Sequence, residues 1–270
     1  MKPFRVGKIS IGGSRPVFIL GPCVIESEKF VWQMARGIAK ICASEDVDLV
    51  FKASYDKANR TSARSFRGIG AREGCKILAA IGRELKIPVT TDVHSPDEAK
   101  LAGEMIDLLQ IPAFLCRQTD LLKAAAETGR AVNVKKGQFL APWDVKNIAE
   151  KLTAFGCKKF CFTERGTTFG YNNLVADMRS LYWMREAGYP VIFDATHSVQ
   201  RPGGAGHATS GDAELAPVLA RAAIAAGCDG IFMEVHENPA RALSDGPNQI
   251  PLKNLPKDLR MLKAIHATVS

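Results

Sequence analysis

The stretch 49–62 contains the densest group of residues that can bind anions. It begins with the apolar run Leu49 to Phe51, which is typical of a buried strand, and continues into a polar segment. Its cations, amide and hydroxyls are Lys52, Ser54, Lys57, Asn59, Arg60, Thr61 and Ser62. Arginine offers a planar pair of donors to a phosphate or carboxylate, lysine a point charge, and hydroxyls short hydrogen bonds. The stretch therefore predicts an anion-binding loop, with a solvated basic loop as the alternative interpretation.

The elements that must position this loop follow one rhythm from residue 17 onward. Short apolar runs of strand length alternate with helical segments, which is typical of parallel βα units. The expected strands are 17–20, 49–52, 89–92, 108–111, 132–135, 160–163, 191–194 and 230–234. The expected helices are about 28–44, 71–86, 96–105, 119–128, 142–155, 175–187, 213–226 and 257–267. Eight strands alternating with eight helices predict an α/β protein with a (β/α)8 TIM barrel.

The amino-terminal segment precedes this repeat. Residues 4–11 alternate between apolar and polar, and Gly12-Gly13 follows, so residues 1–14 are expected to hold a β-hairpin. No linker, low-complexity stretch or composition break divides the chain. We therefore expect residues 1–270 to form a single barrel domain.

In such a barrel the site lies at the carboxyl ends of the strands. Each predicted strand is followed there by one group that can bind, ionise or coordinate. In chain order these groups are Cys23, Lys52, Asp92, Gln110, Lys135, Arg165, His197 and Glu234. Any one of them has a structural interpretation, but eight on one functional face favour an active site.

The cations of this face are expected to point into one mouth. They are Lys52, Lys57, Arg60, Lys135 and Arg165. Like charges repel strongly in a cleft of low dielectric constant, so such a group is favourable only where anions bind. Five cations suit two phosphorylated substrates, or one phosphate with a carboxylate and a second phosphate.

A second set on this face has the composition of a metal site. Cys23, His197, Glu234 and Asp245 offer one sulfur, one nitrogen and two carboxylates. The first three follow strands that become neighbours when the barrel closes. The set fits a divalent first-row metal such as Zn²⁺, Fe²⁺ or Mn²⁺ and not a dedicated Ca²⁺ or Mg²⁺ cage. The alternatives are a thiol at the barrel mouth, a phosphate-binding histidine and a glutamate paired with a lysine.

The composition of the chain indicates which kinds of partner it can bind. The net charge of +8 and the isoelectric point near 9.2 favour anionic partners, but the cations occur singly at strand ends and only 7% of residues are aromatic. Small anions are therefore expected rather than nucleic acid. No apolar run approaches the roughly 20 residues that cross a bilayer, and the start Met1-Lys2-Pro3-Phe4-Arg5 has no signal-peptide core. The seven scattered cysteines indicate reduced thiols, so we expect a cytoplasmic protein.

Three long loops are expected at the mouth, at 53–70, 198–212 and 237–254. The second is rich in glycine but contains no nucleotide-binding motif with the right spacing. We therefore interpret it as a lid over the site. The third carries Asp245.

Several of these segments together resemble the family of 3-deoxy-D-manno-octulosonate 8-phosphate synthases over almost the whole chain. The segments in which the resemblance lies are Gly21-Pro22-Cys23-Val24-Ile25-Glu26-Ser27, Lys52 to Ser62, Leu109 to Thr119, Asn133 to Phe139, Thr163-Glu164-Arg165-Gly166, Phe193 to Gln200 and Ser244-Asp245-Gly246-Pro247. The family condenses phosphoenolpyruvate with arabinose 5-phosphate to make a precursor of the lipopolysaccharide inner core. The resemblance implies this activity and, since family members are usually homotetramers, that assembly.

The resemblance also implies residue roles. Lys52, Ser54 and Lys57 would meet the carboxylate of phosphoenolpyruvate. Its phosphate would meet Gln110, Ala113, Lys135 and Arg165. Arg60 and Thr61 would meet the phosphate of the pentose, and Asn59 and Asp92 its sugar. The family usually has serine at the position of Thr61, which keeps the hydroxyl. His197 is expected to contact substrate as well as metal. The residues expected to take part in the chemistry itself are Lys52, Lys57, Asp92, Lys135, His197 and Asp245.

The family has metal-free members with asparagine at the position of Cys23 and metal-dependent members with cysteine there. Cys23, Gly137 and Cys228-Asp229-Gly230 resemble the metal-dependent class, which implies that Cys23, His197, Glu234 and Asp245 bind the ion. Three alternatives stay open at this point. They are a 3-deoxy-arabino-heptulosonate 7-phosphate synthase that uses erythrose 4-phosphate, a Schiff-base aldolase with Lys52 or Lys135 as nucleophile, and a nucleic-acid-binding barrel without activity.

Overall fold

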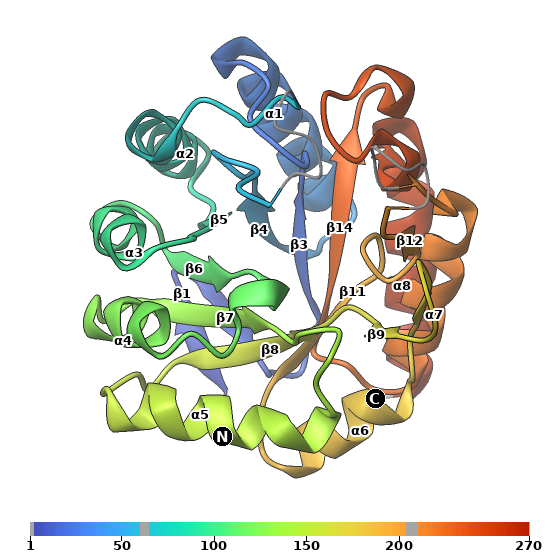
Figure 1. Cartoon of the computed structure of the whole chain (residues 1–270). Coiled ribbons are helices and arrows are strands. Elements are labelled where there is room, and N and C mark those ends of the chain that lie inside the picture. Colours follow the sequence, from blue (N-terminus) through green and yellow to red (C-terminus); the bar gives the residue numbers. More distant parts are fainter. Residues whose placement is uncertain (1–2, 60–64, 204–209, 270) are drawn as a thin grey trace.

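A closed barrel of eight parallel strands forms the centre of the protein (Figure 1). The computed structural model describes residues 3–59, 65–203 and 210–269. The barrel strands are β3 (Val17–Gly21), β4 (Asp48–Lys52), β5 (Val89–Asp92), β6 (Leu108–Ile111), β7 (Ala131–Lys135), β8 (Phe160–Glu164), β11 (Val191–Asp194) and β14 (Gly230–His236). Strands adjacent in this order pair in parallel, and β11 pairs with β14 to close the ring. All eight expected strands are therefore confirmed, most of them one or two residues longer.

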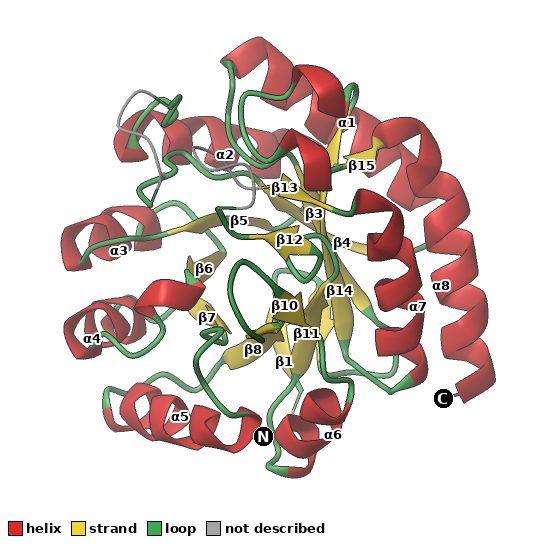
Figure 2. Ribbon diagram, turned by 45° about the vertical axis from the view of Figure 1, so that its right-hand side comes forward, coloured by secondary structure: helices red, strands yellow, loops and turns green. Residues whose placement is uncertain are grey.

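In the described ranges, eight helices surround the barrel (Figure 2). They are α1 (Glu28–Ser44), α2 (Ala71–Leu85), α3 (Pro96–Gly103), α4 (Thr119–Glu127), α5 (Val145–Ala154), α6 (Arg179–Glu186), α7 (Ala216–Ala225) and α8 (Leu255–Val269). Side-chain caps start two of them, since Ser27 accepts a hydrogen bond from the N–H of Phe30 and Ser95 one from the N–H of Glu98. The predicted (β/α)8 TIM barrel is confirmed.

Three predicted helices begin later than expected. The first turns at 142–144 and 213–215 are 3-10 helices, so α5 begins at Val145 and α7 at Ala216. The start of α6 was predicted at 175, which is wrong. Residues Leu174–Val175 form β10, which pairs with β9 (Thr167–Thr168), and Asp177 accepts a hydrogen bond from the N–H of Arg179 at the start of α6. Local pairing thus replaces the first turn of the expected helix.

The expected amino-terminal hairpin is present as β1 (Phe4–Val6) and β2 (Ile9–Ile11). Its apolar side chains Phe4, Val6, Ile9 and Ile11 belong to the same cluster as the lowest layer of the barrel interior. That layer consists of Val17, Ile19, Val50, Leu108, Ala131, Cys161, Ile192 and Phe232. The hairpin therefore closes the amino-terminal end of the barrel with apolar surface.

Two residues further along the same strands, the side chains that point into the barrel are polar. Because alternate side chains of a strand share a face, the residues two positions beyond this apolar layer also point into the barrel. They are Lys52, Gln110, Asn133, Thr163, Asp194 and Glu234, and all are buried. The opposite faces of the strands pack against the helices in one large core. The sequence period therefore places an apolar floor under a polar layer at the carboxyl ends.

The long loop after β11 contains a short hairpin of its own. β12 (Gln200–Arg201) pairs with β13 (Ser210–Gly211), so the described part of the loop predicted to be a lid has regular structure. A further short strand, β15 (Ile250–Pro251), pairs with the end of β14.

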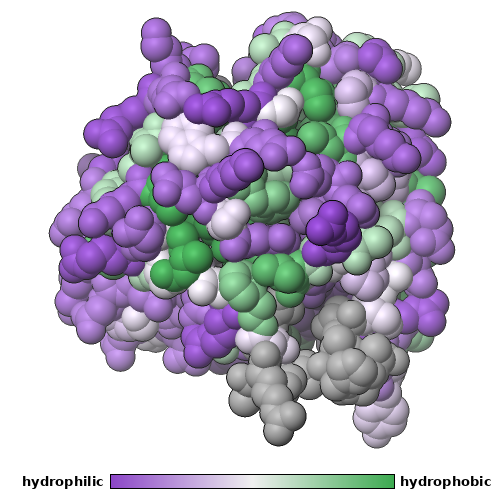
Figure 3. Space-filling view, turned by 90° about the horizontal axis from the view of Figure 1, so that it is seen from above, coloured by the Kyte–Doolittle hydropathy of each residue, from purple (hydrophilic) through white to green (hydrophobic). Residues whose placement is uncertain are grey.

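The outer surface carries mainly hydrophilic residues on the face seen in Figure 3, with apolar residues in patches between them. Within the described ranges, no helix has the length and apolar character needed to cross a membrane.

Candidate active site

Lys52 and Glu234 meet at the centre of the polar layer. Lys52 ends β4 and Glu234 lies on β14, and Lys52 Nζ is 2.6 Å from Glu234 Oε1 with both side chains 1% exposed. Lys57 Nζ lies 3.7 Å from the same oxygen. Burial raises the pKa of Glu234, but its cationic neighbours, above all Lys52, outweigh burial and hold that pKa below its usual range. The carboxylate is thus ionised and shared by two lysines.

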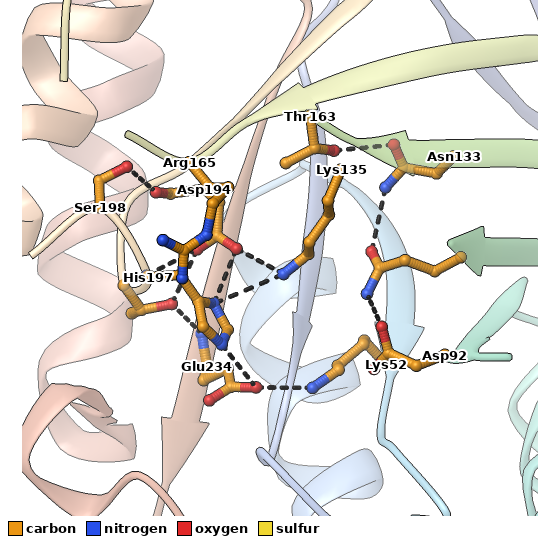
Figure 4. A network of polar contacts seen from close by, with 12 residues as sticks. Lys52, Asp92, Asn133, Lys135, Thr163, Arg165, Asp194, His197, Ser198 and Glu234 are labelled. Atoms are coloured by element: carbon orange, nitrogen blue, oxygen red, sulfur yellow. Dashed lines mark hydrogen bonds and ion pairs between the residues drawn. The ribbon is translucent and has the colours of Figure 1, made fainter. Parts of the chain in front are cut away.

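A second group of charges centres on Asp194, at the end of β11. Its Oδ2 accepts a hydrogen bond from Lys135 Nζ at 2.6 Å and lies 2.7 Å from His197 Nδ1. Its Oδ1 accepts the N–H of His197. Burial raises the pKa of Asp194, but His197 and Lys135 outweigh it and lower the pKa. Figure 4 shows His197 between the two groups, with Nε2 3.7 Å from Glu234 Oε1.

The floor between the two groups is the ring of Phe232. Lys135 Nζ lies 3.9 Å from the ring centroid and Lys52 Nζ 5.5 Å from it. A cation over an aromatic face is stabilised by the ring quadrupole. The ring therefore favours both ammonium groups while it closes the barrel below them.

Arg165 is a buried cation with an incomplete set of partners. Its side chain is 5% exposed and its Nη2 donates to Gln200 on β12. Its Nη1 has no hydrogen-bond partner among the described residues. Burial lowers the pKa of Arg165, as expected for a cation removed from water. A guanidinium with a free buried N–H group suits an anionic ligand.

Glu164 holds the backbone of the segment that carries Arg165. Glu164 Oε1 accepts the N–H groups of Arg165 and Gly166, and Lys136 Nζ lies 3.5 Å from Oε2. Lys136 also donates to the carbonyl of Leu140. This buried ion pair joins the loops that follow β7 and β8.

Asp92 lies on the other side of the mouth, at the end of β5. Its Oδ2 accepts the Ser54 hydroxyl at 2.6 Å and its Oδ1 accepts Gln110 Nε2 at 2.7 Å. Lys57 donates in turn to Ser54. Burial raises the pKa of Asp92, but three lysines, above all Lys52, outweigh burial and hold that pKa below its usual range. The group is therefore held as a carboxylate.

The candidate metal ligands converge beside Glu234. Cys23, Glu234 and Asp245 each offer one ligand atom, and these atoms lie within 4.8 Å of one another. His197 does not belong to this group, although its Nε2 approaches Glu234. Cys23 Sγ is 3.1 Å from Asp245 Oδ2. Burial, reinforced by the two carboxylates, raises the pKa of the Cys23 thiol.

The loop that carries Asp245 is tied to the Cys23 segment. Gln249 accepts the N–H of Cys23 and donates to the carbonyl of Ser244 at 2.8 Å. The Ser244 hydroxyl lies 2.8 Å from Cys23 Sγ. On the other side, Gly21 lets this segment approach β4, because a Cβ there would lie 1.7 Å from the carbonyl oxygen of Lys52. The side chains of Gln249 and Ser244 therefore hold the segments of Cys23 and Asp245 together.

The mouth holds carboxylates beside its cations. Four cations, Lys52, Lys57, Lys135 and Arg165, share the mouth with the carboxylates Asp92, Asp194, Glu234 and Asp245. Folding buries these cations because carboxylates from other strands neutralise them.

Not every predicted site residue joins this arrangement. Ala113 is buried at the start of the 3-10 turn after β6. Asn59 is exposed in a turn and has no side-chain hydrogen bond among the residues that the structure describes. Arg60 and Thr61 lie outside the described residues.

The structure also brings together groups that sequence reasoning missed. Asp194, Ser244, Gln249 and Glu164 hold site residues in place without having been assigned a role. Asp194 carried a signal, since it ends an apolar strand three residues before His197. A second group with metal-ligand chemistry, Asp56, His94 and Glu98, lies outside the barrel interior and is partly exposed.

A closed parallel barrel with lysines, an arginine and acidic groups at its carboxyl ends belongs to the TIM-barrel class that places its site there. Comparison with known families then narrows the class. The model of the DAHP synthetase I family matches residues 2–270, and the chain belongs to this family.

Curated relatives resemble the chain over its full length. The protein named 2-dehydro-3-deoxyphosphooctonate aldolase of Geobacter sp. (strain M21) is 56% identical over 270 residues, which cover 100% of this chain and 99% of the relative. The protein of the same name from Pelobacter propionicus is 58% identical over 265 residues, covering 98% and 97%. That of Geobacter sulfurreducens is 56% identical over 269 residues, covering 99% of both.

Proposed function

We propose that this chain is a 3-deoxy-D-manno-octulosonate 8-phosphate synthase, the activity also named 2-dehydro-3-deoxyphosphooctonate aldolase. It condenses phosphoenolpyruvate, arabinose 5-phosphate and water to the eight-carbon sugar acid phosphate and inorganic phosphate, for lipopolysaccharide inner-core biosynthesis. Relatives of that name are more than half identical over the whole chain. The structural observation that carries the proposal is the pair of cation groups, Lys52 with Lys57 and Lys135 with Arg165, on either side of His197.

The two cation groups match the two charged ends of phosphoenolpyruvate. Lys52, Lys57 and Ser54 would hold its carboxylate. Lys135, Arg165, Gln110 and the backbone at Ala113 would hold its phosphate, and the unpartnered Nη1 of Arg165 supports this assignment. Orienting two anions that repel each other in water contributes several kcal/mol to catalysis in favourable cases.

The chemistry forms one C–C bond and one C–O bond to water, and breaks the C–O bond to phosphate. C3 of phosphoenolpyruvate attacks the pentose aldehyde while water adds at C2, and C–O cleavage then expels phosphate. Lys135 and Arg165 would stabilise the charge that collects on the leaving phosphate. Asp92, held ionised by its neighbours, would accept a hydroxyl of the sugar, together with Asn59. Arg60 and Thr61 would bind the pentose phosphate.

We also propose a divalent ion, Zn²⁺, Fe²⁺ or Mn²⁺, at Cys23, His197, Glu234 and Asp245. Ligand atoms about 2.0–2.3 Å from one ion lie within about 4.6 Å of one another, which the Cys23, Glu234 and Asp245 group approaches. The balanced charges of the mouth also favour an added cation before two phosphates enter. When bound, such an ion acidifies water or polarises a carbonyl.

The chain's own residues prepare that position. Asp194 Oδ2 lies 2.7 Å from Nδ1 of the His197 ring, and Nε2 of the ring lies on the side of Glu234. Lys52 neutralises Glu234, which would be one of the residues that hold the ion. Retention of metal, and activity with arabinose 5-phosphate before and after chelation, test this part of the proposal.

Three further properties belong to the proposal. We infer that residues 1–270 form one domain in the cytoplasm, with small anions and not nucleic acid as partners. We also infer a homotetramer. Exposed aromatic residues follow three consecutive strands and support an interface there: Phe114, Phe139, Trp143, Phe169 and Tyr171. Light scattering tests the mass, which should be four times 29.3 kDa.

The test of the function is release of phosphate from phosphoenolpyruvate in the presence of either aldose. Release with arabinose 5-phosphate and little with erythrose 4-phosphate supports the proposal. The reverse preference would identify the heptulosonate phosphate synthase instead. Borohydride should trap no substrate on the protein, because the proposed reaction forms no imine with a lysine.

A further inference from the structure

A line of side-chain hydrogen bonds crosses four consecutive strands and ends on Asp92 (Figure 4). Thr163 Oγ1 on β8 donates to Asn133 Oδ1 on β7 at 2.8 Å. Asn133 Nδ2 donates to Gln110 Oε1 on β6 at 3.0 Å. Gln110 Nε2 donates to Asp92 Oδ1 on β5 at 2.7 Å. The strand register explains this line, since Asp92, Gln110 and Asn133 are partners on neighbouring strands with side chains on the same face.

The direction of the line is fixed by the carboxylate at its end. A carboxylate only accepts hydrogen bonds, so Gln110 must turn its NH2 group to Asp92 and its oxygen to Asn133. Asn133 must then turn its own NH2 group to Gln110 and its oxygen to Thr163, whose hydroxyl donates. Every donor therefore points toward Asp92.

The line is closed to solvent. Thr163, Asn133 and Gln110 are each 0% exposed. Bulk water therefore does not reach these amides, and an unpaired amide at this depth is unfavourable. The second donor to Asn133 Oδ1, Cys161 Sγ at 3.5 Å, is a weak one. The Thr163 hydroxyl is thus the group that keeps the Asn133 amide from turning over.

We propose that Asn133 and Thr163 are positioning residues of the reaction, which act through Gln110 to hold Asp92 in the site. Neither residue touches substrate in the assignment given above, whereas Gln110 and Asp92 do. This inference rests on the proposed function. It adds two residues from the interior of the barrel to those that determine binding of the pentose.

The test replaces one hydroxyl by a methyl group of the same size. Thr163→Val removes the donor to Asn133, and Thr163→Ser keeps it. Thr91→Val is the matched control, because Thr91 is also buried in a barrel strand but its hydroxyl has no partner among the described residues. Loss of one buried hydrogen bond corresponds to about 10-fold in an equilibrium or rate constant.

For Thr163→Val we expect kcat/KM for arabinose 5-phosphate to fall about 10-fold through a higher KM. Thr163→Ser should restore most of it, and Thr91→Val should equal the wild type. A merely structural role would lower the melting temperature of Thr163→Val without moving KM, and would overturn the proposal. So would a kcat/KM within two-fold of the Thr91→Val variant.

A crystal structure of Thr163→Val separates this inference from the proposed function. If the wild type shows no turnover of arabinose 5-phosphate, the proposed function fails, but the position of Gln110 is still measurable. We expect the contact between Gln110 Nε2 and Asp92 Oδ1 to lengthen beyond hydrogen-bonding distance. An unchanged contact would overturn the positioning role of Thr163.

Discussion

Lys52 and Glu234 form an ion pair inside the barrel, with 2.6 Å between Nζ and Oε1 and both side chains 1% exposed. The strand period turns both side chains into the barrel, since each lies two residues beyond an apolar interior residue, Val50 and Phe232, and closure of the barrel brings β4 and β14 to either side of β3. The same carboxylate belongs to the candidate metal set. The pair therefore connects the anion-binding lysines with the proposed ion.

Lys52→Met leaves Glu234 buried with a weaker set of partners. In the presence of chelator we expect the free energy of unfolding to fall by about 3 kcal/mol, as for other buried pairs that lose one member. Urea denaturation measures the change. The double variant Lys52→Met with Glu234→Gln should lose less than the single variant, and a single variant as stable as the wild type would contradict the role of the pair.

Cys23→Ala removes the one sulfur of the candidate metal set. We expect the purified variant to retain almost no divalent metal after dialysis and to lose most of its activity, because thiolate is a strong ligand for first-row metals. Metal content per chain is the measurement. Cys75→Ala, which removes another buried thiol but on α2, is the control and should keep its metal. Full activity of Cys23→Ala in chelator would rule out the assignment.

Lys136 and Glu164 form a second buried pair, at 3.5 Å. Removal of the Lys136 charge leaves Glu164 buried without the ammonium group beside it, although two backbone N–H groups still donate to it. Lys136→Met should therefore lower the free energy of unfolding by about 3 kcal/mol. Because Glu164 holds the backbone of Arg165, phosphoenolpyruvate should also bind less tightly in calorimetry.

Lys123 provides the matched control for that variant. It lies 3.9 Å from Glu127 on the surface of α4, where both side chains are about half exposed. Exposed pairs contribute about 0–1 kcal/mol, so Lys123→Met should change stability little. Equal losses in the two variants would mean that burial of the Lys136 pair has no consequence.

Glu98 makes stability depend on acid pH. Burial raises its pKa, but hydrogen bonds from His94 and Tyr55 outweigh burial and lower the pKa from 4.5 to about 2. A lowered folded-state pKa stabilises the protein above the unfolded pKa, and this contribution disappears as pH falls from 4.5 toward 2. The advantage of the wild type over Glu98→Gln, about 1 kcal/mol at neutral pH, should shrink over that window.

Denaturation of both proteins between pH 6 and pH 3 measures that difference. Glu127→Gln, at an exposed position on α4, should show no such trend. A difference between wild type and Glu98→Gln that stays constant down to pH 3 would contradict the role of the His94 and Tyr55 hydrogen bonds.

Much of the fold followed from the sequence because the signal is local. Apolar runs of strand length and helix caps such as Ser95 before Pro96 gave eight strands and eight helices close to their observed bounds. The start of α6 did not follow, since pairing of 174–175 with 167–168 depends on a turn between them. Local propensity does not decide such a competition.

The position of the site could be predicted from the sequence, but the contacts between its charged groups could not. The carboxyl-end rule placed Lys52, Lys135 and His197 in one mouth. It did not reveal that Asp194 joins Lys135 to His197, because that contact needs the distance between β7 and β11 across the barrel. The hydrogen bonds that join Asn133, Gln110 and Asp92 could not be predicted either, since they depend on strand register and not on any motif.

The central claim is that one end of the barrel holds a divalent ion and two anions together. Anomalous diffraction from crystals grown with Zn²⁺ and phosphoenolpyruvate tests it most directly. We predict an anomalous peak about 2.3 Å from Cys23 Sγ, with Asp245 and Glu234 as further ligands and the phosphate at Arg165 Nη1. A peak at Asp56, His94 and Glu98 instead, or a phosphate bound away from Arg165, would contradict it.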